Sequence, residues 1–498
     1  MIRFNKSALR DKIYACWLGK NIGGTMGAPF EGTTELLDIQ GFNSPEGTAL
    51  PNDDLDLQLV WLRAMYEQGP KAINSKVLGE YWTNFIGPHW NEYGNCKANM
   101  RAGILPPLSG SLHNGDWKHS NGAWIRTEIW ACTYPGLPEK AIRYAFEDAS
   151  VDHGFGEGSY AAIFVAAMES AAFIINDLRT LIRIGLSKIP ADCRVARSVG
   201  IVLDAYDKGI DWKTARNLVV EDSADLGWFQ APGNVAFAVL GLLYGEGDFK
   251  KTMILTVNCG DDTDCTGATV GSLMGIMYGT KIIPEDWKNF IGDNIVTVAL
   301  VRGTGFFPES CQQLTDLVMN LIPVAACYEN FFVEGDSWWT GKETRIELTD
   351  GEDDFSEVNA EKFCGDRFVK KMFSRSPSSF TVEGTFASAL VEFEKEPVID
   401  ANGTLNCKIS LSHETVANFH FLNKQDIFEL HWHLPEGWTV NGRRTIFLSG
   451  GKRLGSEPNF AEITLCAGEK VEPINRLVLE IRRSQHAMPL LVPITILG

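Results

Sequence analysis

The 498-residue sequence lacks the features that mark several large classes of protein. No apolar run reaches the roughly 18 uninterrupted residues of a membrane-spanning helix. The N-terminal segment MIRFNKSALRDKIYACW has neither the apolar stretch nor the small-residue cleavage site of a signal peptide. The 11 cysteines are irregularly spaced and include no CxxC pair, which disfavours a zinc ribbon and a disulfide framework. These absences predict a soluble, cytoplasmic protein with no membrane partner.

A basic excess is also missing from the sequence. The 63 acidic residues outnumber the 45 Lys and Arg residues, which gives a formal net charge of −18. Nucleic-acid-binding domains usually carry a basic face, so this charge argues against a nucleic-acid partner. The composition, with 45% hydrophobic residues and no low-complexity stretch, is typical of a globular protein with more than one domain. It leaves the oligomeric state open.

The hydrophobic pattern changes along the chain. Up to about residue 330, apolar residues recur at helical spacing, as in segments 55–65 and 160–172, and strands do not alternate with helices. From about residue 376, β-branched and aromatic residues form short, turn-bounded segments that are typical of an antiparallel sandwich. The expected strands are 379–393, 404–411, 417–422, 427–433, 445–448 and 477–481.

We therefore predict a multi-domain α + β protein. An all-α domain spans residues 1–334 and a β-sandwich domain spans residues 376–498, with a linker or elaboration at residues 335–375. Within the sandwich, residues 434–440 resemble strands of the immunoglobulin-like modules that are appended to carbohydrate-active enzymes. We accordingly expect an immunoglobulin-like arrangement.

Two acidic clusters each precede a predicted helix. The first is Asn-Asp-Asp-Leu-Asp at residues 52–56, and capping of one helix explains one of its acids but not three. The second is Gly-Asp-Asp-Thr-Asp at residues 260–264. Adjacent carboxylates repel each other unless protons or a cation neutralise them, and their oxygens suit hard cations such as Mg²⁺. Together the clusters predict a divalent-metal site.

A glycine-rich segment, GKNIGGTMGAPFE, occupies residues 19–31. It lacks the Gly-Lys-Ser/Thr ending of a Walker phosphate loop, and no strand clearly precedes it, so we reject a phosphate loop. Glycines let two backbones approach closely. We expect a closely packed helix followed by a turn that presents Glu31.

Four ordered segments of the chain resemble the ADP-ribosylglycohydrolase family, and the ordered set is more specific than any single segment. The similarity covers about residues 8–325 and excludes the β-rich region, and residues 147–153 add to it. The four segments are 23–31, 52–54, 120–126 (Ser-Asn-Gly-Ala-Trp-Ile-Arg) and 260–264.

The resemblance implies an all-α fold with two Mg²⁺ or Mn²⁺ ions in a central cleft, where a glycosidic bond of an ADP-ribose conjugate is hydrolysed. The implied metal ligands are Asn52, Asp53, Asp54, Asp262 and Asp264. The implied catalytic residues are Glu31, Asp53 and Asp262. The implied substrate-binding residues are Asn121, Gly122, Arg126, Asp152 and His153.

The chain departs from the family pattern at the site itself. Asn52 stands where the family usually has Thr, and its amide oxygen can still bind a metal. Cys265 also stands where the family has Thr, and a thiol is a poor ligand for a hard cation, which leaves Thr266 or water for that position. Residues 23–27 read Gly-Gly-Thr-Met-Gly instead of Gly-Asp-Ala-Leu-Gly. These departures bear on the substrate more than on the fold.

Three functions remain open at this point. The leading one is metal-dependent hydrolysis of an N- or O-glycosidic bond to ADP-ribose or a related ribosyl group. The second keeps the fold but acts on a sugar other than ADP-ribose, which the altered Thr positions and the extra β domain favour. The third is a catalytically silent binding protein, which Asn52 and Cys265 permit but the retained carboxylates oppose.

Overall fold

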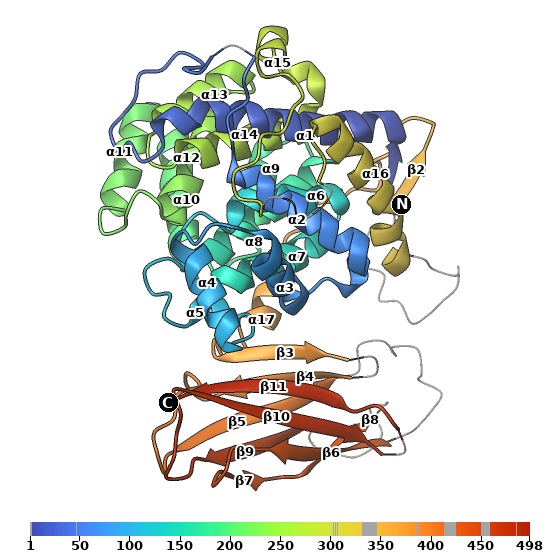
Figure 1. The fold of residues 1–498 in the computed structure, drawn as a ribbon. Coiled ribbons are helices and arrows are strands. Elements are labelled where there is room, and N and C mark those ends of the chain that lie inside the picture. The colour runs from blue at the N-terminus through green and yellow to red at the C-terminus, as the bar shows by residue number, and fades with distance from the viewer. Residues whose placement is uncertain are drawn as a thin grey trace.

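The structure is a computed structural model, in which helices form one part of the molecule and two β-sheets form the other (Figure 1). The predicted strand 417–422 lies outside the described residues. The described residues are 2–45, 47–301, 303, 305, 307–330, 346–384, 387–412, 425–449, 459–484 and 486–498.

The part of the chain before residue 331 is almost entirely helical, as predicted. Among its described residues, no helix is both long enough and apolar enough to cross a membrane. Its helices are α1 (Lys6–Gly27), α2 (Asp53–Gln68), α3 (Ser75–Phe85), α4 (Asn91–Ala102), α5 (Leu108–Ser111), α6 (Glu128–Thr133), α7 (Pro138–Asp152), α8 (Glu157–Ala172), α9 (Leu178–Leu186), α10 (Arg194–Asp207), α11 (Trp212–Asp222), α12 (Ala231–Gly245), α13 (Phe249–Asn258), α14 (Thr263–Tyr278), α15 (Glu285–Ile291) and α16 (Cys311–Asn330).

Helices α1 and α14 pack backbone to backbone, side by side in Figure 1. A Cβ atom on Gly23 would overlap the carbonyl oxygen of Gly267, and one on Gly27 would overlap that of Thr263. Only glycine permits so close an approach. The C-terminal end of α1 therefore lies against the N-terminal end of α14, which confirms the close packing predicted for the glycine-rich segment.

The described part of segment 335–375 packs against the helices. Strand β2 (Ile346–Thr349) pairs in parallel with β1 (Ile2–Asn5), a short N-terminal strand that the sequence did not predict. Helix α17 (Arg367–Met372) buries Phe368 and Met372 in the hydrophobic cluster of the helical part. The described part of this segment therefore belongs with the helices in space. The exact division of the chain into domains stays a prediction.

The C-terminal part consists of two antiparallel sheets that share one hydrophobic cluster between them. The predicted segment 379–393 forms a hairpin instead of one strand, since β3 ends before Gly384. The sheet orders are β11-β10-β6-β8 and β3-β4-β5-β9-β7. The strands are β3 (Ser379–Glu383), β4 (Ser388–Phe393), β5 (Thr404–Ser412), β6 (Gln425–His433), β7 (Thr439–Gly442), β8 (Thr445–Ser449), β9 (Phe460–Cys466), β10 (Ile474–Arg483) and β11 (Leu490–Leu497).

The antiparallel β prediction is confirmed, and the immunoglobulin-like arrangement stays a prediction. Strands β7, β9 and β11 were missed. Strand β9 has a plain alternating pattern that could have been recognised. Strand β11 contains Pro493, which usually argues against a strand; here β11 is an edge strand, where a missing N–H donor is tolerated.

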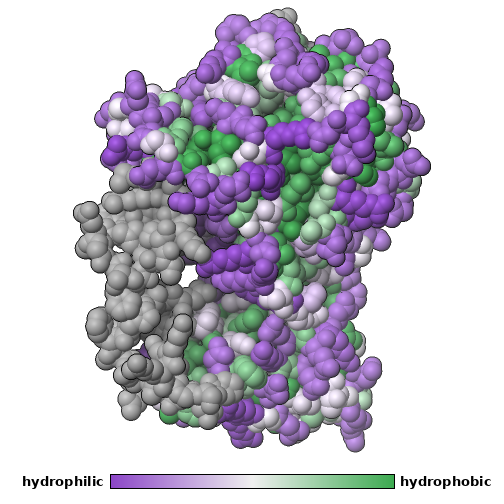
Figure 2. All heavy atoms as spheres, turned by 180° about the vertical axis from the view of Figure 1, so that it is seen from behind, coloured by the Kyte–Doolittle hydropathy of each residue, from purple (hydrophilic) through white to green (hydrophobic). Residues whose placement is uncertain are grey.

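The two parts meet at α4 and α5. Ile104, Leu108 and Leu112, which belong to the helical part, join the hydrophobic cluster between the two sheets. The Thr495 hydroxyl of β11 donates a 2.8 Å hydrogen bond to the carbonyl oxygen of Gly103, directly after α4. Figure 2 shows the opposite face of the molecule, where hydrophilic residues predominate among the described ones.

Candidate functional site

Glu31 is held at the entrance to helix α14 by backbone pairing. It follows the short helix η1 (Ala28–Phe30) at the end of α1. The N–H of Gly32 donates to the carbonyl oxygen of Asp261 at 2.9 Å, and the N–H of Asp261 donates to that of Thr33 at 2.7 Å. Asp261 adopts a left-handed conformation, with φ of 61°, to make this turn. The packing of α1 on α14 thus places the first predicted catalytic carboxylate beside the second acidic cluster.

The first acidic cluster lies at the N-terminus of α2, where one residue does the capping. The Asn52 side-chain oxygen accepts a 2.8 Å hydrogen bond from the N–H of Asp54. The carboxylates of Asp53 and Asp54 are therefore not used as caps. Asp56 points elsewhere, because its carboxylate accepts the backbone N–H groups of Val298 and Ala299 at 2.6 and 2.5 Å.

The second acidic cluster opens α14. The Asp262 side chain makes no capping bond, although Asp262 is the cap residue of that helix. One of its oxygens accepts a 2.7 Å hydrogen bond from the Asn121 amide, and its backbone N–H donates to Asn234 at 3.1 Å. Asp264 lies in the first turn of the helix and is almost fully buried. Neighbouring side chains thus orient Asp262, and its second oxygen remains without a hydrogen bond.

These carboxylates converge on one place. Oxygens of Glu31, Asp262 and Asp264 lie within 4.8 Å of one another, and so do ligand atoms of Asp54, Asp264 and Cys265. Asp264 belongs to both groups, so the two groups adjoin. Buried oxygens of Asp262 and Asp264 have no hydrogen-bond partner in the described structure, and one buried Asp54 oxygen has only the Lys20 ammonium at 3.8 Å. Because buried polar atoms are normally paired, these orphaned oxygens fit a bound cation.

The electrostatics of the cluster agree with this geometry. Desolvation, followed by repulsion from Asp264 and Asp53, raises the pKa of Glu31 to about 7. Burial and Asp264 raise the pKa of Asp53 to about 6, against the opposing effect of a hydrogen bond from Tyr93. Burial raises the pKa values of Asp54 and Asp262 well above their usual range. Without a cation, the cluster holds protons that it would release on binding one.

The model of the ADP-ribosylglycohydrolase family matches residues 5–322. The chain belongs to the ADP-ribosylglycohydrolase family. The predicted resemblance is confirmed, and membership supports a hydrolase that acts on ADP-ribose conjugates. A comparison with curated proteins found no match.

A solved structure described as an "ADP-ribosylglycohydrolase-related protein complex" has 17% sequence identity to this chain and a TM-score of 0.40. The match covers 64% of this chain and 99% of that one. At this level of similarity, the neighbour does not bear on the activity of this ADP-ribosylglycohydrolase-family chain.

Lys20 is a part of the site that the sequence did not reveal. Its ammonium lies 2.7 Å from Glu128 and 3.8 Å from Asp54, and the Lys20 and Asp54 side chains are fully buried. Gln58 donates to the second oxygen of Glu128 at 2.8 Å, so both oxygens of that carboxylate have a donor. A lysine inside a glycine-rich helix gave no signal of its own. Its effect is to place a buried positive charge beside Asp54.

The predicted substrate-binding residues divide into two sets. Asn121 lies beside the carboxylates, since it donates to Asp262, whereas Gly122 lies against Glu92 and His153. Arg126, Asp152 and His153 are fully buried. The guanidinium of Arg126 pairs with both oxygens of Asp152, at 2.7 and 3.1 Å. These three side chains are closed to solvent, and their role toward a substrate stays a prediction.

Cys265 and Thr266 follow the second acidic cluster, where the sequence departs from the family pattern. The Cys265 thiol donates a 3.5 Å hydrogen bond to an Asp54 oxygen, and burial raises the pKa of the thiol well above its usual range. The Thr266 hydroxyl donates to the carbonyl oxygen of Thr263 inside the same helix. The Thr266 hydroxyl is thus used within its own helix, and the replacement of the missing ligand by Thr266 or water stays a prediction.

Two tryptophans are exposed near these residues. Trp228 has 36% of its surface exposed, and its ring lies beside Gly32, next to Glu31. Trp90 has 47% exposed, and its ring centre is 6.1 Å from that of Tyr93, which contacts Asp53. Neither stood out in the sequence. Trp228 thus lies near Glu31 and Trp90 near Asp53, and exposed aromatic rings can stack on a ligand.

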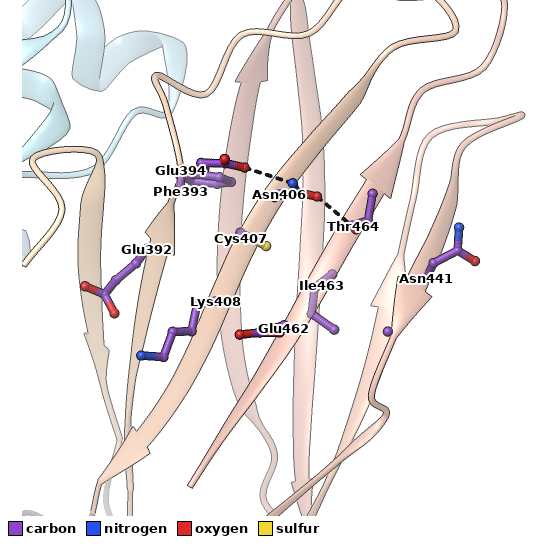
Figure 3. A pocket seen from close by; sticks show the side chains of 11 residues that line it. Glu392, Phe393, Glu394, Asn406, Cys407, Lys408, Asn441, Glu462, Ile463 and Thr464 are labelled. Atoms are coloured by element: carbon purple, nitrogen blue, oxygen red, sulfur yellow. Dashed lines mark hydrogen bonds between the residues drawn. The ribbon is translucent and has the colours of Figure 1, made fainter. Parts of the chain in front are cut away.

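A separate surface pocket, with a volume of about 590 Å³, lies on the outer face of the five-stranded sheet (Figure 3). Asn406 donates to Glu394 at 2.8 Å and accepts from Thr464 at 2.9 Å. These side chains satisfy one another, and none of them belongs to the carboxylate cluster. The candidate active site is therefore the cluster between α1, α2 and α14.

Proposed function

We propose that the protein is a divalent-metal-dependent hydrolase that cleaves an N- or O-glycosidic bond of ADP-ribose or a related ribosyl conjugate. The observation that carries this proposal is the convergence of Glu31, Asp54, Asp262 and Asp264 around buried oxygens that lack partners. Family membership supports the same class of reaction.

The donor set fits Mg²⁺ or Mn²⁺, because it consists of carboxylate oxygens. Asp53, Asp54, Asp262 and Asp264 would hold the metal, with the second lone pair of the Asn52 oxygen available from its capping position. The shared position of Asp264 supports two ions side by side. When bound, such ions act as Lewis acids that hold sugar hydroxyls and lower the pKa of a water.

The chain's own residues supply the remaining chemistry. Cleavage at an anomeric carbon develops positive charge on the sugar, which nearby carboxylates stabilise. Glu31 is exposed, and its raised pKa suits a group that takes a proton and returns it near neutral pH. Asp53 and Asp262 are oriented by Tyr93 and Asn121, which keeps their oxygens directed at the site.

One observation favours a substrate other than ADP-ribose. A diphosphate needs cationic or N–H donors. Lys20 and Arg126 are both buried and paired with carboxylates, so neither is free to bind it. Together with Asn52 and Cys265, this supports a glycoside hydrolase of the same fold that acts on another sugar as the second candidate.

The deciding experiment compares metal-loaded and metal-stripped protein on ADP-ribosyl-arginine and on aryl ribosides and glycosides. Metal-dependent release of ADP-ribose, lost in the Asp262→Asn/Asp264→Asn variant, supports the first candidate. Cleavage of aryl glycosides alone supports the second. A folded protein that binds neither Mg²⁺ nor Mn²⁺ and cleaves nothing would leave a catalytically silent binding protein.

A further inference from the structure

A second group of ionisable side chains lies apart from the carboxylate cluster. The Nδ1 atom of His153 is 2.9 Å from a carboxylate oxygen of Asp152, and its Nε2 atom is 2.9 Å from the hydroxyl of Ser120. Ligand atoms of Glu92, Asp152 and His153 all lie within 4.8 Å of one another. Glu92 comes from α4, whereas Asp152 ends α7 and His153 follows it.

The charges of this group do not balance. Arg126 pairs with Asp148 at 2.9 Å and with Asp152 at 2.7 Å, and both partners are buried. Glu92 is a third buried carboxylate, and Asp152 is among the charges that act on it. One guanidinium thus faces three carboxylates. Two uncompensated negative charges cannot remain in a buried environment, so either two protons or one divalent cation must neutralise them.

Glu92 also has an oxygen that points to a missing partner. Its Oε2 atom is fully buried and makes no hydrogen bond to any described residue. A buried carboxylate oxygen without a donor is costly, whereas a metal ion would use it directly.

We propose that Glu92, Asp152 and His153 bind a divalent first-row transition cation, Zn²⁺ or Mn²⁺, at a site separate from the catalytic carboxylates. An imidazole nitrogen with two carboxylates suits these ions better than Mg²⁺, which prefers oxygen ligands. The Ser120 hydroxyl, on the other side of the imidazole, fixes the ring through its second nitrogen.

Glycines close this site tightly. A Cβ atom on Gly122 would overlap a carboxylate oxygen of Glu92, and one on Gly158 would overlap the ring of His153. The backbone thus packs directly against two of the three side chains, and all three are buried. The ion therefore has a structural role, in which it joins α4 to the end of α7 beneath Asn121, the residue that holds Asp262.

The test measures bound metal in the full-length protein. The Asp262→Asn/Asp264→Asn variant removes the catalytic centre, and we expect it to retain one tightly bound Zn²⁺ or Mn²⁺ per chain after dialysis. Adding Glu92→Gln or His153→Gln should weaken the affinity for that ion at least tenfold. His89→Gln, which alters an exposed histidine, should change nothing and serves as the matched control.

A second measurement does not depend on how the Glu92 and His153 variants fold. X-ray absorption at the Zn or Mn edge of the Asp262→Asn/Asp264→Asn protein should show scattering from one imidazole. A folded protein that retains no ion, or an ion without an imidazole neighbour, would overturn the proposal and leave two protons as the neutralising charge. Because this readout needs no catalysis, its failure is distinguishable from failure of the proposed hydrolase function.

Discussion

The hydroxyl of Tyr93 donates a 2.9 Å hydrogen bond to the carboxylate of Asp53. Tyr93 lies in the first turn of α4. The segment that follows the C-terminal end of α4, from Gly103 to Leu112, contacts the β-sandwich. One helix thus connects a predicted metal ligand with the C-terminal part of the chain. The sandwich supports the helix that orients the site.

We predict that Tyr93→Phe weakens metal binding while the protein stays folded. The ring remains in its buried place, and only the hydrogen bond to Asp53 is lost. A hydrogen bond to a charged group contributes about 1.5–3 kcal/mol, so we expect the affinity for Mn²⁺ to fall by about tenfold or more. Calorimetric titration of Mn²⁺ into metal-stripped protein measures this change.

Tyr66→Phe is the matched control for that variant. Tyr66 is 46% exposed and donates to the carbonyl oxygen of Leu317, away from the carboxylates. This variant also loses a tyrosine hydroxyl, but not one that contacts a predicted metal ligand, so its Mn²⁺ affinity should equal that of the wild type. Equal affinities for the wild type and Tyr93→Phe would show that Tyr93 does not orient a ligand.

The contact between α1 and α14 predicts a severe effect of Gly23→Ala. The added methyl group would overlap the carbonyl oxygen of Gly267 and force the two helices apart. We expect the free energy of unfolding to fall by about 3 kcal/mol or more, as overpacking against backbone allows little relaxation. Urea unfolding, followed by circular dichroism, measures the difference.

Gly200→Ala is the matched control, because it adds the same methyl group where there is space for it. Gly200 lies within α10, and a Cβ atom there would meet no atom within 4 Å. Alanine favours a helix over glycine by about 1 kcal/mol, so this variant should be slightly more stable than the wild type. Similar stabilities for the two alanine variants would contradict the proposed backbone contact.

Leu112→Ala tests the junction between the helical part and the sandwich. Leu112 is 1% exposed and belongs to the cluster between the two sheets. Removing a buried leucine side chain should lower the free energy of unfolding by about 2–5 kcal/mol. Leu491→Ala, at a residue 54% exposed, should cost less than about 1 kcal/mol in the same urea titration. Equal small losses would mean that Leu112 does not stabilise the junction.

The sequence was informative where one local pattern carries the chemistry. The acids at 52–56 and 260–264 stand out because adjacent carboxylates repel each other. Both clusters also belong to the four segments that occur in the same order in the family. The helical and strand-rich regions followed from periodicity in the same way. Strands β9 and β11 show the limit: one was readable but overlooked, and the other contains a proline that an edge position tolerates.

The rest of the site depends on contacts between distant segments, which local patterns do not contain. Lys20 meets Glu128 across 108 positions, and Tyr93 meets Asp53 across 40. A single lysine, tyrosine or glutamate has no periodicity that reveals its partner. Arg126 illustrates the converse, because its motif was recognised but its burial against Asp148 and Asp152 could be seen only in the fold.

The carboxylate cluster also predicts an unusual dependence of stability on pH for the metal-free protein. The pKa values of Glu31 and Asp53 are raised to about 7 and about 6, above the ordinary values of 4.5 and 3.8. A raised pKa means that the folded state binds more protons than the unfolded state. The stability from this source is therefore present below about pH 4 and is lost as the pH rises to about 7.

A divalent cation should remove this loss, because it replaces the protons that the cluster releases. We expect the Tm of metal-stripped protein to fall between about pH 5 and pH 7.5, and the Tm with saturating Mg²⁺ to fall less, so that the two curves separate as the pH rises. Glu31→Gln should show a smaller fall without metal, since one titrating carboxylate is gone. Curves that stay parallel with and without Mg²⁺ would mean that the ion does not bind these carboxylates, and the metal site would have to be sought elsewhere.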